Sequence, residues 1–203
     1  MYVPRQFETA DRAKILEVMR AYNFALLIDN DDNGVPFATH LPVIVGERDG
    51  SVFIEGHVAK PNPHWRHLAA RSEALVVFLG PHAYMSPSVY SDRQRVPTWN
   101  YLAVHAYGRA RLIEDASKKD ALLKRLIAIH EPVYAEQWRG LGEEFQQKML
   151  SGIVAFEIAV DRLEGKFKLN QHRPEAHAAM KSVYSKGGEQ EKALASWMER
   201  LGL

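Results

Sequence analysis

The chain has 203 residues, of which 46% are apolar and 25% are charged, enough to bury one sizeable hydrophobic core. Its 26 Lys and Arg residues nearly cancel its 25 Asp and Glu residues, so no overall field attracts it to nucleic acid or to an acidic membrane. It contains no Cys, which excludes disulfides, thiolate metal sites and cysteine nucleophiles.

The N-terminal sequence MYVPRQFETADRAK carries charge and a proline where a signal peptide has an apolar core. No apolar run approaches the roughly 18 residues that a membrane span needs. We therefore expect a cytoplasmic protein that makes no contact with a membrane.

The first predicted element is an amphipathic helix. Thr9 is a plausible N-cap and Asp11 lies in the first turn, and apolar residues then recur at helical spacing as far as Asn23. Three β-rich runs follow, separated by the turn sequences NDDNG and GERDG, and they predict an antiparallel meander: FALLID, PFATHLPVIV and SVFIEGHV. Pro36 and Pro42 cannot donate to a ladder, so we expect the second run to be bulged, at an edge or beside a ligand.

Asn62 followed by Pro63 predicts the start of a short helix from about Pro63 to Arg71, which leads into the strand ALVVFLG. The segment from Pro81 to Pro97 is rich in Pro, Ser, Tyr and His and is predicted to be a loop. A polar-aromatic loop of that length is usually functional. The run TWNYLAVHAYGRARLIE then predicts a further strand.

Ser117 with Asp120 resembles a capping box, and it predicts a helix that ends at Pro132. A second helical stretch is expected near 143–150, and IVAFEIAVDRLEGKFKL is interpreted as a final pair of strands. From Pro174 the tail is typical of two short helices on either side of the Gly187-Gly188 pair.

These elements predict one domain over residues 1–203, mainly β with peripheral helices (α+β): a small closed barrel with an N-terminal helix, inserted helices around 117–150 and a helical tail over 174–203. A doubly wound α/β fold is disfavoured because neither G-x-G-x-x-G nor G-x-x-x-x-G-K-[ST] occurs.

Polar and aromatic side chains gather between residues 40 and 105. Six of the nine histidines lie there, at 40, 57, 64, 67, 82 and 105, among several Tyr, Trp, Ser and Asn residues. Such groups suit a planar, phosphorylated ligand, because aromatic rings stack on its ring and a lysine with a helix N-terminus, here in the turn from Gly56 to Pro63, holds phosphate. Ordinary core and interface packing is the competing interpretation.

Two other sites are open on the residues alone. His64 and His67 lie three apart on the predicted helix and could form a metal site with His57 or His82, although no carboxylate completes a familiar motif, and we assign no metal. A Ser-His-Asp site with Ser86 or Ser88 is weaker, because no G-x-S-x-G surrounds either serine.

At these residues the sequence resembles the PaiB family, which is described as FMN-binding negative transcriptional regulators. The resemblance is carried, in order along nearly the whole chain, by MYVPRQFE, HVAKPNPHW, VFLGPHAYMSPSVY, VPTWNYLAVHAYG and KLNQHRP.

The resemblance implies an FMN-binding split β-barrel, similar to pyridoxamine-phosphate oxidases, in which a homodimer holds FMN between its subunits. Thr39, His40, Leu41 and Pro42 would then run beside the isoalloxazine ring, and His57, Ala59, Lys60 and Asn62 would hold the ribityl phosphate. The residues implied to line the ring are Tyr84, Ser86, Pro87, Ser88 and Tyr90, and those implied to come from the partner subunit are Trp99 and Asn100. The closing polar strand would contain Lys168, Asn170 and Gln171.

Three functions follow as hypotheses. The family description favours a regulator that responds through FMN, although the sequence offers DNA only a C-terminal basic set (Lys181, Lys186, Lys192 and Arg200) offset by Glu189, Glu191 and Glu199. The second is a flavin-dependent oxidoreductase with His57, His82 and Tyr84 handling protons. The third is haem binding, because related split barrels bind haem and the chain is rich in histidine.

Overall fold

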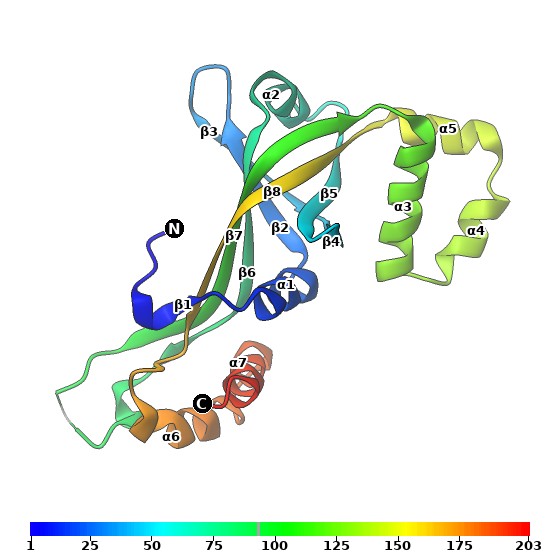
Figure 1. Ribbon diagram of the computed structural model, residues 1–203. Helices are drawn as coiled ribbons and strands as arrows, with labels where there is room; N and C mark the ends of the chain where they lie inside the picture. Colours follow the sequence, from blue (N-terminus) through cyan, green and yellow to red (C-terminus); the bar gives the residue numbers. More distant parts are fainter. Residues whose placement is uncertain (93) are drawn as a thin grey trace. The chain divides into compact units, whose positions relative to one another are not determined.

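The computed structural model describes residues 1–92 and 94–203 (Figure 1). The chain packs into two compact units. We call residues 1–22, 78–105 and 164–203 the terminal unit, and residues 23–77 and 106–163 the central unit.

Among the described residues, eight strands join in one sheet with the order β3-β2-β6-β7-β8-β5-β4, and β1 pairs with β8. The strands are β1 (Glu8–Thr9), β2 (Phe24–Asn30), β3 (Pro36–Pro42), β4 (Ile44–Arg48), β5 (Ser51–Ala59), β6 (Glu73–Met85), β7 (Thr98–Ile113) and β8 (Ile153–Lys168). The expected mainly β fold with peripheral helices is confirmed, and no helix of the described residues is both long and apolar enough to cross a bilayer.

The central unit contains two antiparallel hairpins, β2–β3 and β4–β5. The predicted meander of three runs is wrong, because the second run divides at Val43 into β3 and β4, which stand at opposite ends of the strand order. Pro42 has no N–H to continue a ladder, and the Val43 N–H donates instead to the Asn23 carbonyl (2.9 Å). As expected, Pro36 and Pro42 lie on an edge strand.

Four helices of the described chain belong to the central unit: α2 (His64–Arg71), α3 (Ala116–His130), α4 (Tyr134–Gly140) and α5 (Glu143–Ser151). The N-cap of α3 is Asp115, whose carboxylate accepts from the Lys118 N–H (2.9 Å), so the assignment of Ser117 as the cap is wrong. Ser117 donates its hydroxyl to that same carboxylate. Helix α4 was not predicted.

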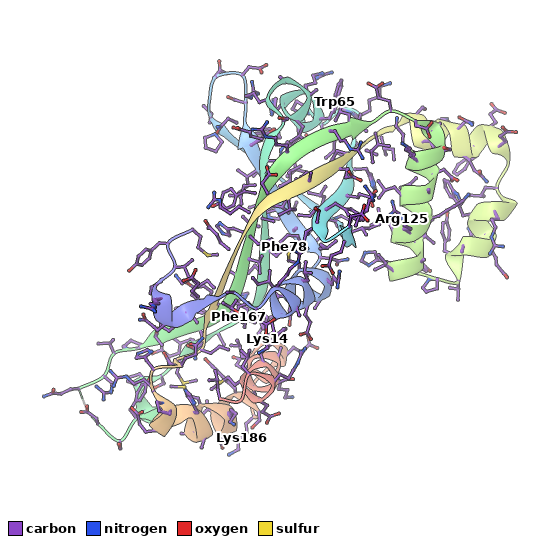
Figure 2. All side chains as sticks on the ribbon, viewed as in Figure 1. Lys14, Trp65, Phe78, Arg125, Phe167 and Lys186 are labelled. Atoms are coloured by element: carbon purple, nitrogen blue, oxygen red, sulfur yellow. The ribbon has the colours of Figure 1, made fainter. Side chains whose placement is uncertain are left out.

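Helix α3 packs on the sheet through Leu122 and Leu126, which form a small core with Ala155 of β8. Its Arg125, labelled in Figure 2, donates from Nη2 to Oε1 of Glu55 on β5 (2.9 Å) and lies 2.8 Å from Oε2. The inserted helices are therefore tied to the sheet by both apolar and ionic contacts.

In the terminal unit, α1 (Arg12–Ala21) begins after Asp11, whose carboxylate accepts from the Lys14 N–H (3.2 Å). Asp11 is thus the N-cap, and the prediction of Thr9 in that role is wrong. Strand β6 continues through Met85, so the loop predicted from Pro81 begins later, and the 3-10 helix η2 (Pro87–Val89) follows it.

The tail forms α6 (His177–Tyr184) and α7 (Glu189–Arg200), as predicted, and the short 3-10 helix Pro174–Ala176 directly precedes α6. Another 3-10 helix, Arg5–Phe7, lies near the N-terminus. The expected final strand pair is wrong, because β8 is one strand of 16 residues. Within β8, Gly165 stands where a Cβ would collide with Thr9 and Ile15, so its missing side chain permits close packing there.

Candidate functional site

The predicted cofactor residues fall into two groups. Those in the central unit are Thr39, His40, Leu41, Pro42, His57, Ala59, Lys60 and Asn62, and those in the terminal unit are Tyr84, Ser86, Pro87, Ser88, Tyr90, Trp99, Asn100, Lys168 and Gln171.

In the central unit, side-chain contacts join β3 to the turn before α2. Oγ1 of Thr39 accepts from Nδ2 of Asn62 (3.2 Å) and lies 2.8 Å from Nδ1 of His64. Oδ1 of Asn62 accepts from the His64 N–H (3.0 Å) at the start of α2, although Pro63 and not Asn62, as predicted, takes the N-cap position. Two predicted site residues, Thr39 and Asn62, are thus in direct contact.

The same turn fixes the backbone of Lys60. Its N–H donates to the Gly152 carbonyl (2.9 Å), and its carbonyl accepts from Nε1 of Trp65 (3.0 Å). The Lys60 residue itself is exposed. A positive charge is therefore presented to solvent from a well-anchored turn at the N-terminus of α2.

Behind Thr39 lies a buried cluster of Asp29, His64 and His67. Oδ1 of Asp29 is 3.3 Å from Nε2 of His64 and 3.4 Å from Nδ1 of His67, and the Phe37 ring packs edge-on against both imidazoles at 5.1 Å. Burial lowers the pKa of His64 to about 4, and burial raises the pKa of Asp29. Within residues 1–92 and 94–203 no group of three or more His, Cys, Asp or Glu side chains is placed to hold a metal ion.

The remaining central residues differ in their surroundings. Nδ1 of His57 is buried without a hydrogen-bond partner in the described chain, and burial lowers the pKa of this imidazole. His40 is exposed and stacks on Phe24 at 6.2 Å, whereas Leu41 belongs to the core. Pro42 and Ala59 end their strands. An unpaired buried imidazole nitrogen is the kind of group that a bound ligand satisfies, so His57 fits a cofactor contact.

In the terminal unit, His82 and Tyr84 of β6 meet Trp99 of the neighbouring β7. The Trp99 ring lies 6.3 Å from Tyr84 and 6.4 Å from His82, and Tyr84 and Trp99 are 51% and 54% exposed. We call these three residues the aromatic surface. Side chains at this exposure suit a flat ring or a protein partner.

Four other predicted residues of this unit serve local structure. Oγ of Ser86 accepts from the Ser88 N–H (3.2 Å) and caps the 3-10 helix that contains Pro87. Asn100 is fully buried and donates from Nδ2 to the Tyr184 hydroxyl of α6 (3.0 Å), although its Oδ1 has no hydrogen-bond partner in the described chain.

Tyr90 and Lys168 line a cavity of about 250 Å³ between the end of β8 and the segment that leads into β7. Gln171 folds back instead: its Nε2 donates to the Phe167 carbonyl, and its Oε1 accepts from the Leu169 N–H (2.9 Å). Gln171 therefore closes the end of β8.

Besides Asp29, sequence reasoning missed two further buried carboxylates of the central unit. Glu55 and Glu157 are buried beside a cavity of about 420 Å³, where Glu157 accepts from Arg111 (2.7 Å) and lies 3.4 Å from Arg48. Both acids interrupt apolar strand runs, FIEGHV and AFEIAV, and a charge at an inward position was the signal that could have found them.

Half of the basic C-terminal set is used inside the terminal unit. Nζ of Lys181 donates to the Leu203 carbonyl (2.5 Å), and Arg200 pairs with Glu17 and lies 4.2 Å from the Trp197 ring centroid. These contacts favour packing of the tail over a recognition helix.

Residues 1–162 match the family described as "Putative FMN-binding domain". The chain is 38% identical over 180 residues to the protease synthase and sporulation protein PAI 2 of Bacillus subtilis (strain 168), which covers 86% of this chain and 84% of that protein. It is 33% identical over 126 residues to an uncharacterized protein of Saccharomyces cerevisiae, with 60% of this chain and 72% of that protein covered.

Two solved structures are similar in fold. The flavocytochrome Anf3 of Azotobacter vinelandii superposes with a TM-score of 0.61 at 17% identity over 82% of this chain and 72% of that one. The FAD and heme binding protein of Mycobacterium smegmatis gives 0.59 at 20% identity over 79% and 73%. These likenesses show that the chain shares the fold of both proteins, which in its described residues is an antiparallel sheet of eight strands with peripheral helices. The chain belongs to the FMN-binding family matched by residues 1–162, as its resemblance to PaiB predicted, and its cofactor is FMN.

Proposed function

We propose that the protein is a negative transcriptional regulator that responds through its bound FMN and acts in the cytoplasm as a homodimer of single-domain chains. The observation that carries this proposal is the 38% identity to PAI 2, a protein named for protease synthesis and sporulation, over 86% of this chain. Bound FMN supplies a redox-active ring, and the chain supplies its position and surroundings.

In this proposal the turn before α2 holds the FMN phosphate. Lys60 contributes a positive charge at the N-terminus of α2, where the helix macrodipole also favours an anion. The backbone contacts of Lys60 with Gly152 and Trp65 support this role, because they fix the turn without using the ammonium group.

The contacts of Thr39 support a different role, next to the ribityl chain or the ring edge. When Asp29 is ionised, it favours the His64 tautomer with the proton on Nε2, so Nδ1 accepts from the Thr39 hydroxyl. Asn62 already donates to that oxygen. Thr39 therefore offers a ligand only a lone pair, which matches a ribityl hydroxyl or a ring N–H and disfavours phosphate.

The aromatic surface is proposed to meet a second copy of the chain. Tyr84 and Trp99 expose about half of their surface on adjacent strands, and exposed aromatic side chains of this kind are typical of the central part of an interface. The family resemblance implies a flavin held between two subunits, and in this proposal the same surface covers the ring from the partner.

The cofactor site is tested by the visible spectrum of protein that has been loaded with FMN or riboflavin and then freed of excess flavin. We expect retention of FMN and loss of riboflavin. Lys60→Glu should weaken FMN binding at least about tenfold, because a like charge replaces a charge-assisted contact. Lys148→Glu, at an exposed lysine on α5, is the matched control. Equal FMN affinity in the two variants would contradict the assignment of Lys60 as a phosphate contact.

Regulation is tested by the mobility of DNA fragments from upstream of the protein's own operon, with excess competitor DNA and with FMN oxidised or reduced. A shift that depends on the flavin state supports the regulator. The solvent-exposed His82, Tyr84 and Trp99 favour a flavin-dependent oxidoreductase as the second candidate. Steady turnover of reduced nicotinamide without any DNA shift would replace the first proposal by the second.

A further inference from the structure

A basic cavity lies in the terminal unit, whereas the turn proposed to hold the FMN phosphate belongs to the central unit. Its volume is about 250 Å³, and its lining includes Arg95, Lys168, Arg173 and His172. No carboxylate of the described residues lines it. We propose that this cavity binds the phosphate or carboxylate group of a second, small anionic ligand.

The cations are held in place by their neighbours. Nζ of Lys168 donates to Oγ1 of Thr98 (2.6 Å) and lies 6.0 Å from the ring centroids of Phe7 and Tyr101. The guanidinium of Arg95 lies 5.7 Å from the Tyr90 ring centroid, and its Nε is buried without a hydrogen-bond partner in the described chain. Such fixed cations lose little freedom when an anion arrives.

The hydroxyl groups of the lining are also arranged as donors. Thr98 accepts from Lys168, and Tyr90 accepts from Nδ2 of Asn170 (3.0 Å), so each hydroxyl hydrogen remains available. Asn170 is 4% exposed and has a φ of +56°, a conformation that costs energy for a residue other than glycine. A lining of donors and cations recognises an anion and rejects a cation.

Two acids lie near the cavity and limit its charge without filling it. Asp92 pairs with Arg95 (3.0 Å) in a partly exposed contact. The negative charge of Glu175 acts to raise the pKa of Tyr90 and of His172 without an ion pair or hydrogen bond to either. The positive charge of Arg173 reaches Tyr90 as well, where it works to lower the pKa of the phenol against the larger effect of burial. Arg173 and Lys168 therefore remain as the principal charges for a ligand.

The size of the cavity sets the ligand class. About 250 Å³ accommodates phosphate, a small phosphate ester or a short carboxylic acid, and it is below the roughly 300–1,000 Å³ of sites that enclose larger ligands. Tyr90 and Lys168, first assigned to the flavin, are reassigned here to this second ligand. The inference rests on the proposed function only in placing the FMN phosphate elsewhere.

The test titrates inorganic phosphate into the FMN-loaded full chain by calorimetry, with chloride replaced so that ionic strength stays constant. We expect saturable binding that Lys168→Gln weakens about tenfold or more, because a charge-assisted contact is lost. Arg173→Gln should have the same effect and serves if Lys168→Gln folds poorly. The matched control is Lys186→Gln, at an exposed lysine between α6 and α7 (Figure 2).

Three outcomes overturn the inference. One is the absence of saturable phosphate binding, and another is an equal loss in Lys186→Gln. The third is phosphate binding to flavin-free protein that FMN abolishes, because the cavity would then hold the phosphate of FMN itself. Failure of the chain to retain FMN contradicts the proposed function instead, and it is read separately from the flavin spectrum.

Discussion

At the scale of single residues, the buried cluster behind Thr39 is the most unusual part of the molecule. The Asp29 carboxylate lies within 3.4 Å of the imidazoles of His64 and His67, and all three side chains are buried. Burying such groups costs free energy unless they pair with one another. Their protonation therefore couples the stability of the fold to the hydrogen bonds that Thr39 can offer.

The first prediction concerns pH. The pKa of His64 is about 4 in the fold and near 6.5 in the unfolded chain, so the unfolded state binds more protons between these values. The contribution of neutral His64 to the free energy of unfolding is fully present above about pH 6.5. It is lost as the pH falls toward 4, by up to about 3 kcal/mol. In denaturant titrations, we expect the free energy of unfolding of the wild type to fall with decreasing pH more steeply than that of His64→Gln.

Asp29 acts in the opposite sense, because burial raises its pKa and the fold then favours its protonated form as the pH falls. His67, Arg71 and Asp31 also act on this carboxyl. Asp29→Asn should therefore steepen the loss of stability in acid, which separates the two groups. Parallel pH profiles for the wild type and His64→Gln would contradict the assignment of a depressed pKa.

Single residues also show where sequence reasoning reached its limit. The aromatic and histidine content between positions 40 and 105 indicated a site, and the helix start near Asn62 was recognised to within about a residue, because the Asn62 side chain accepts from the His64 N–H. Asp29 could not be found, because one acid at the end of FALLID looks like a turn residue until the hairpin brings it to His64 and His67. Spacing along the chain does not encode contacts between separate elements.

At the scale of elements, the ion pair of Arg125 with Glu55 joins helix α3 to the sheet, in addition to the apolar core that they share. Arg125→Ala would leave Glu55, which is 5% exposed, without its partner. We expect a loss of about 1–3 kcal/mol in the free energy of unfolding, less than for a fully buried pair because Arg125 is half exposed. Adding Glu55→Gln to that variant should recover much of the loss, since no buried charge then remains.

Denaturant unfolding of the wild type, the two single variants and the double variant measures the coupling. If the two single losses simply add, the contact does not hold α3. Arg48→Ala provides a comparison, because its partner Glu157 keeps the closer contact with Arg111.

Strands and helices with strong periodicity could be predicted from the sequence, and their connections could not. The tail helices, β7 and the first helix were found, because their patterns are long and regular. The division of the second β-rich run needed the contact between Val43 and Asn23, which is not local in sequence. Similarly, β8 was interpreted as two strands, because its pairing with β5 at one end and with β1 at the other joins residues that are far apart in the sequence.

At the scale of the whole molecule, the proposed homodimer makes a direct prediction. Trp99→Glu places a charge in the aromatic surface and should shift sedimentation from dimer to monomer, with loss of retained FMN. Phe145→Glu, at a 47% exposed aromatic residue of α5, is the matched control and should leave both properties unchanged. A monomeric wild type, or an unchanged dimer in Trp99→Glu, would exclude this surface as the interface.

The path of the chain through the two units has a consequence for dissecting the protein. The backbone passes from one unit to the other after Tyr22, Val77, His105 and Leu163, and β6, β7 and β8 each belong to both. Neither unit is a continuous stretch of gene, so neither can be expressed alone by truncation. A protease that nicks the exposed link between α3 and α4, around Val133, would leave two fragments. Each fragment would contain residues of both units, since β8 in the second fragment crosses from one unit to the other. We therefore expect the nicked protein to stay assembled until it is denatured.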